Sequence, residues 1–284
     1  MTAGTWRWMR LGGGAAILLA LVRAVGTGPF LEGVRTVDRR SLAVAAGIAV
    51  VTTLCCAWRW SLVARGFGVH VPLRAAFGAY YRSQFLNSTL PGGVLGDVHR
   101  AVRHGRSVGD IGASSRSVVA ERVAGQAVTL AMAAAVLVWL PAAPPSVVAA
   151  FAICAALAVG GMLAALRRRP AHRSSWVWAG VALASAVVAV GHAATFLVAV
   201  AATGATTSPA RVLPVAVVVL AASAVPVNLA GWGPREGAAA WAFGWAGLSA
   251  TQGVTAAVTY GVLALVATVP GALLLLRDWR AGVG

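Results

Sequence analysis

Long apolar runs separated by short polar segments dominate this chain. Six of the runs are long enough to cross a bilayer, because one spanning helix needs about 20 apolar residues. They cover residues 11–28, 41–64, 118–140, 146–166, 176–202 and 252–276. The pattern therefore predicts an all-α fold, a polytopic transmembrane helical bundle, built as one integral membrane domain over residues 1–284.

Two further regions, 72–113 and 209–250, interrupt apolar sequence with proline and glycine. In the second region, the apolar pieces 212–225 and 237–250 would each rise only about 21 Å as helices, which is short of the roughly 30 Å hydrocarbon core. We interpret both regions as re-entrant or broken helical hairpins. Entering from opposite faces, the cytoplasmic face for the first and the outer face for the second, their tips would meet near the midplane of the membrane.

Composition and charge fit this class and set an orientation. The chain is 59% hydrophobic and 11% charged, with a net charge of +16 that comes entirely from arginine. These arginines lie mostly between the spans, which argues against a nucleic-acid partner and follows the positive-inside rule. We expect the protein in the cytoplasmic membrane of a prokaryote, in contact with anionic lipid, with both termini in the cytoplasm and an outer loop around residues 29–40.

The two proline–glycine breaks also hold most of the candidate functional residues. Ionisable side chains are costly inside a membrane and persist mainly where they serve a site. Glycine and proline permit tight turns there, arginine can bind phosphate, and a carboxylate can balance arginine or bind a cationic or sugar headgroup. The candidates are Asn87, Pro91, Gly92, Gly93, Gly96, Asp97 and Arg100 at the first break, Glu121 and Arg122 at the start of the third span, and Pro226, Asn228, Gly231, Gly233, Arg235 and Glu236 at the second break.

Simpler structural roles stay open for several of these residues. Asp97 could cap the helix that follows it, and Glu236 could be held by a helix dipole. Glu121 and Arg122 could anchor the third span at the interface. Arg59, between two tryptophans, is expected to extend to the lipid headgroups. The scattered cysteines and histidines, His192 included, show no metal-ligand spacing, so no metal and no cofactor is expected.

Four motifs in order resemble one known family, the lysylphosphatidylglycerol synthase transmembrane region, also described as flippase-like integral membrane proteins. The resemblance covers roughly residues 40–276. The motifs are Trp58-Arg59-Trp60, residues 85–100 (FLNSTLPGGVLGDVHR), residues 121–125 (ERVAG) and residues 226–236 (PVNLAGWGPRE). The charged positions that match the family are Asp97, Arg100, Glu121, Arg122, Arg235 and Glu236.

The resemblance implies translocation of an anionic or glycosylated or aminoacylated lipid across the cytoplasmic membrane. The alternative is an accessory membrane partner of a glycosyltransferase that presents a polyprenyl-phosphate sugar, with the arginine-rich segment 99–116 as its docking surface. A membrane-embedded transferase with Asp97 or Glu236 as its base ranks last. Neither a nucleophile nor a metal accompanies either acid, and no soluble catalytic domain or nucleotide-binding motif is visible, so no enzyme activity is expected.

Overall fold

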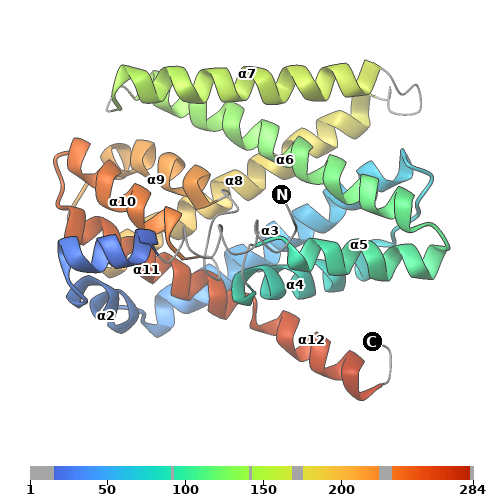
Figure 1. The fold of residues 1–284 in the computed structure, drawn as a ribbon, viewed down its shortest axis with the longest axis horizontal. Helices are drawn as coiled ribbons and strands as arrows, with labels where there is room; N and C mark the ends of the chain where they lie inside the picture. Colours follow the sequence, from blue (N-terminus) through green and yellow to red (C-terminus); the bar gives the residue numbers. More distant parts are fainter. Residues whose placement is uncertain (1–15, 91–92, 141–142, 168–174, 224–231, 282–284) are drawn as a thin grey trace.

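The structure, a computed structural model, describes residues 16–90, 93–140, 143–167, 175–223 and 232–281. These residues form a helical bundle (Figure 1). A first helix covers Ala16–Val25. The others are α2 (Gly28–Arg35), α3 (Arg39–Arg65), α4 (Leu73–Thr89), α5 (Leu95–Val108), α6 (Ile111–Trp139), α7 (Pro145–Arg167), α8 (Ser175–Ala202), α9 (Pro209–Ser223), α10 (Pro234–Trp245), α11 (Ala250–Ala267) and α12 (Val269–Arg280).

Five described stretches are long and apolar enough to cross a membrane: α3, α6, the part of α7 up to Met162, α8, and α11 together with α12. A sixth is added if the helix Ala16–Val25 and α2 are counted as one broken span. The predicted polytopic bundle of about six spans is therefore confirmed. The helix expected over 11–28 does not continue that far, because the chain bends by 95° between Val25 and Gly28.

The segment expected to be an outer loop forms the short helix α2, which packs against α11. Pro29 lies in its first turn, where the missing amide hydrogen costs nothing. At Gly33 a Cβ atom would lie 2.8 Å from the Thr255 carbonyl oxygen, so only glycine allows this close approach. The Thr259 hydroxyl also donates to the Gly33 carbonyl over 3.0 Å. The sequence did not predict this helix, because eight residues give too weak a periodic signal, and the outer position of the segment stays a prediction.

The beginning of α3 is fixed by a reciprocal cap outside the span. The Ser41 amide donates to the Asp38 carboxylate over 2.7 Å, and the Asp38 amide donates back to the Ser41 hydroxyl over 3.2 Å. Hydrogen bonding from Ser41 holds the pKa of the Asp38 carboxyl below its usual value. The carboxylate therefore stays charged at neutral pH, and α3 begins at a defined residue.

The bundle has two halves, each containing one helical hairpin (Figure 1). The α4–α5 hairpin packs with α3 and α6 around a core that includes Trp60 and Tyr80. The helices on either side of the second break, α9 and α10, pack with α8 and α11 around Phe196 and Phe243. Packing of α3 along α8 joins the two halves. Each break is thus flanked by two helices, as the hairpin interpretation requires, and the direction in which each hairpin enters the membrane stays a prediction.

Close packing inside the first hairpin depends on Gly96. A Cβ atom there would lie 2.0 Å from the Ser83 carbonyl oxygen on α4. We expect Gly96→Ala to force α4 and α5 apart and to destabilise the protein by about 1–3 kcal/mol, the usual cost of overpacking. Gly47→Ala on α3 is the matched control, because a Cβ atom at Gly47 meets nothing within 4 Å. Thermal unfolding of the purified variants in detergent measures the difference, and equal stabilities would contradict it.

Candidate functional site

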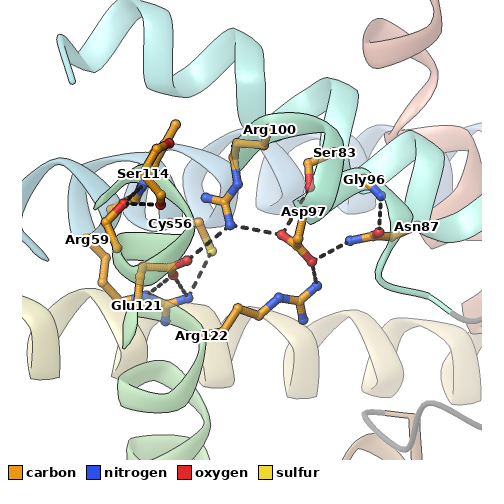
Figure 2. A network of polar contacts seen from close by, with 12 residues as sticks. Cys56, Arg59, Ser83, Asn87, Gly96, Asp97, Arg100, Ser114, Glu121 and Arg122 are labelled. Carbon is orange, nitrogen blue, oxygen red and sulfur yellow. Dashed lines mark hydrogen bonds and ion pairs between the residues drawn. The ribbon is translucent and has the colours of Figure 1, made fainter. Parts of the chain in front are cut away.

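Five charged side chains from α3, α5 and α6 form a continuous network in the first half (Figure 2). Glu121, which is fully buried, accepts from Arg59 Nε over 2.6 Å and from Arg100 Nη2 over 3.3 Å. Arg100 Nη2 also donates to Asp97 over 2.9 Å, and Arg122 pairs with the other oxygen of the same carboxylate. The network joins three guanidinium groups to two carboxylates, so it carries a formal excess of one positive charge.

Neutral groups also hold the Asp97 and Arg100 side chains of this network. The Ser83 hydroxyl and the Asn87 amide donate to the Asp97 carboxylate over 3.1 Å and 3.0 Å. Asn87 in turn accepts from the Gly96 amide over 2.7 Å, which closes the tip of the first hairpin (Figure 2). The Arg100 guanidinium lies 4.0 Å from the ring centre of Tyr80 and 4.6 Å from that of Trp60, positions that favour cation–π attraction.

A second, smaller charged group stands at the beginning of α10. Arg235 donates to Glu236 over 2.8 Å from Nε and 2.5 Å from Nη2, and the Gly233 amide donates to the other Glu236 oxygen over 2.7 Å. Gly233 has a φ of +117°, a conformation that glycine adopts readily. Across from it, a Cβ atom at Gly261 would lie 2.2 Å from Arg235 Nη2, so this glycine makes room for the guanidinium.

A cavity of about 370 Å³ lies between described residues of the two hairpins, and we call it the central cavity. Asn87, Ser88 and Gly93 line it from the first hairpin, while Trp232 and Arg235 line it from the second. Arg122 also lines it, with 51% of its side chain exposed. All of the acids in the two charged groups lie outside the lining. The described lining therefore presents two cations, hydroxyl and amide groups, and one indole ring.

The structure brings together most of the residues selected from the sequence, but in different roles. Asp97, Arg100 and Glu121 form the buried network, whereas Arg122 and Arg235 reach the cavity. Asp97 makes no capping bond, since α5 begins after Val94 without a side-chain cap. The glycine at 96 serves helix packing rather than ligand approach. Five of the predicted positions lie outside the described residues: Pro91 and Gly92 at the first break, and Pro226, Asn228 and Gly231 at the second.

Sequence reasoning misplaced one arginine and overlooked several cavity residues. Arg59 does not extend to the headgroups, because it is 7% exposed and bound to Glu121 and to the Ser185 hydroxyl. Polar residues spaced three or four apart within apolar spans were the available signal, because such residues share one helix face. His192 and Thr195 on α8 line the central cavity in this way. Tyr260 on α11 and Thr268, between α11 and α12, also line it.

Comparison with known proteins agrees with this architecture. The sequence pattern of the lysylphosphatidylglycerol synthase TM region matches residues 7–271. The chain belongs to this family. The match covers both hairpins and all five members of the charged network, so the family resemblance carried by the four motifs is confirmed. The chain is an integral membrane protein, and its family connects it with lipid-related function. Neither the curated proteins nor the solved structures gave a match.

Proposed function

We propose that this protein translocates a lipid with an anionic headgroup across the membrane. The observation that carries the proposal is the central cavity between the two hairpins, with Arg122 and Arg235 in its wall. Guanidinium groups bind phosphate through charge-assisted hydrogen bonds, which are among the strongest available in a low-dielectric site. Membership in a lipid-related family supports a lipid as the molecule that carries this phosphate group.

The remaining lining favours a headgroup that carries hydroxyl groups. Thr53, Gln84 and Ser88 offer donors and acceptors on one side of the central cavity, and Tyr260 and His192, themselves 3.1 Å apart, offer them on another. Trp232 supplies a flat apolar surface of the kind on which sugar rings stack. A phosphate bearing a glycerol or sugar group satisfies all of these side chains, whereas a cationic aminoacyl group would face two arginines without a free acid among the described residues.

An apolar groove beside the central cavity gives the lipid chains a path. Gly47, Val51, Val190 and Ala194 line it between α3 and α8. Ile48 and Thr52 line both the groove and the central cavity, so the two spaces adjoin. A headgroup in the cavity and a hydrocarbon chain in the groove is the arrangement that a lipid translocator needs. The proposal assigns no chemical step to the acids, which balance the arginines.

Headgroup selectivity tests the proposal. Phosphatidylglycerol should cross proteoliposome membranes at least about tenfold faster than lysyl-phosphatidylglycerol, since one unfavourable charge contact in a buried site costs more than about 1.4 kcal/mol. Arg122→Gln should reduce that ratio, while Arg116→Gln, on the same helix but away from the central cavity, should keep it. Preferential movement of the lysylated lipid would contradict an anion-selective cavity.

A further inference from the structure

A second cavity lies apart from the central one, between α3, α4 and α5, and we call it the basic cavity. It measures about 270 Å³. No described residue lines both cavities. Its polar lining consists of cations, histidines and one serine, with no acid among the described lining residues: Arg82, His99, Arg100, Arg103, His104 and Ser107.

Buried nitrogen atoms in this lining lack hydrogen-bond partners. They are Arg100 Nε and Nη1, His99 Nδ1 and His104 Nε2. Arg100 is 1% exposed, so bulk solvent does not satisfy its free N–H groups. A buried donor without a partner costs about 1–3 kcal/mol, and more when it is charged. The two arginine nitrogens are donors, and each histidine nitrogen is a donor in one of its tautomers. Together they indicate a place for an acceptor rather than four independent defects.

Charge also accumulates around the basic cavity. Arg100 Nη2 donates to both Asp97 and Glu121. Its Nε and Nη1 atoms have no hydrogen-bond partner, and apart from these bonds the guanidinium has cation–π contacts with Tyr80 and Trp60. On another side of the cavity, the Asp278 carboxylate of α12 forms an ion pair with Arg82 Nε at 2.7 Å and a second ion pair with Arg103. One carboxylate thus serves two guanidinium groups. The arginines of the lining therefore carry more positive charge than the neighbouring carboxylates neutralise.

We propose that the basic cavity binds a phosphate-type anion. A tetrahedral oxyanion has enough oxygen atoms to accept from Arg100, Arg103 and a histidine together, and it would supply the missing negative charge. The phosphate could belong to a lipid headgroup or to a soluble phosphate compound, since both present the same chemistry. This site is independent of the central cavity and of the proposed translocation.

Binding of inorganic phosphate to the full chain tests this site. The protein is placed in nanodiscs of phosphatidylcholine alone and titrated calorimetrically at low salt, where screening is weak. We expect saturable binding that Arg103→Gln weakens about tenfold, because one charged hydrogen bond is lost. Asp278→Asn should strengthen it several-fold, because Arg82 and Arg103 then become available. A merely structural role for these arginines would not produce this gain.

Three more variants separate the basic cavity from general charge and from misfolding. Ala79→Leu fills the cavity without changing charge and should abolish binding. Arg106→Gln on α5 and Arg116→Gln on α6 each remove an exposed arginine outside the lining of the basic cavity, and both should bind phosphate as the wild type does. Binding that Arg106→Gln or Arg116→Gln weakens as much as Arg103→Gln does would overturn the assignment.

The same titration in nanodiscs containing phosphatidylglycerol identifies the source of the phosphate. Loss of phosphate binding in the nanodiscs that contain phosphatidylglycerol, which Arg103→Gln does not restore, supports a lipid headgroup as the occupant. Unchanged phosphate binding supports a soluble phosphate compound. Absence of saturable phosphate binding in phosphatidylcholine, together with equal phosphatidylglycerol retention by the wild type and Ala79→Leu, would show that the basic cavity holds no anion.

Discussion

Replacing Glu121 with glutamine is expected to lower the free energy of unfolding by about 3–5 kcal/mol. That is the usual cost of removing one partner from a buried ion pair. The reason is the position of its carboxylate, fully buried between Arg59 and Arg100. With an amide at this position, Arg59 loses its acid, and Asp97 is the one acid of the network left for Arg100 and Arg122. Neither Arg59 nor Arg100 can turn to water, since both side chains are enclosed.

Denaturant unfolding of the purified protein in detergent measures this loss. Glu32→Gln is the matched control, because Glu32 is an exposed acid on α2 and should change stability by less than about 0.5 kcal/mol. A Glu121→Gln variant as stable as this control would mean that the buried network contributes nothing to the fold. The motif of residues 121–125 would then need another explanation.

Filling the central cavity is expected to abolish lipid movement while leaving the fold intact. Ala49 lines this cavity from α3, and Ala49→Trp would place an indole ring in a space of about 370 Å³. The charge does not change, and the only polar group added is the indole N–H, so the effect reports mainly on space. We expect the translocation rate to fall at least about a hundredfold, to the level of protein-free vesicles, because the substrate headgroup and the indole cannot occupy the same space.

Ala46→Trp is the control for this variant. Ala46 is exposed, lies on the same helix three residues earlier, and is absent from the lining of the central cavity. It should translocate lipid at the wild-type rate. Equal translocation by Ala49→Trp and the wild type would exclude the central cavity as the route and would move the proposed site elsewhere.

The sequence predicted the class, the spans and both breaks because each depends on local patterns. Apolar length decides the spans, and proline with glycine decides the breaks. It could not predict the partners of the charged residues. Asp97 and Arg100 are neighbours in sequence, yet the contacts of Glu121 with Arg59 and Arg100 depend on how α3, α5 and α6 pack together.

Arg59 shows why the partners of a buried charged residue cannot be predicted from the sequence alone. An arginine between two tryptophans in a span fits an interfacial position, and nothing local distinguishes this from burial. The decisive feature is Gly125 on α6, where a Cβ atom would lie 2.4 Å from Arg59 Nη1. The space for the guanidinium thus comes from another helix. The same holds for Arg235, whose space is provided by Gly261.

The most direct test of the account is a lipid-translocation assay with the wild-type protein. Liposomes carrying fluorescent phosphatidylglycerol in both leaflets are treated with dithionite, which bleaches only the outer leaflet, with and without an imposed proton gradient. The account predicts that bleaching proceeds well beyond half of the label in vesicles that contain the protein. Bleaching that stops at half under both conditions, with folded protein in the vesicles, would contradict translocation and would favour the accessory role beside a glycosyltransferase.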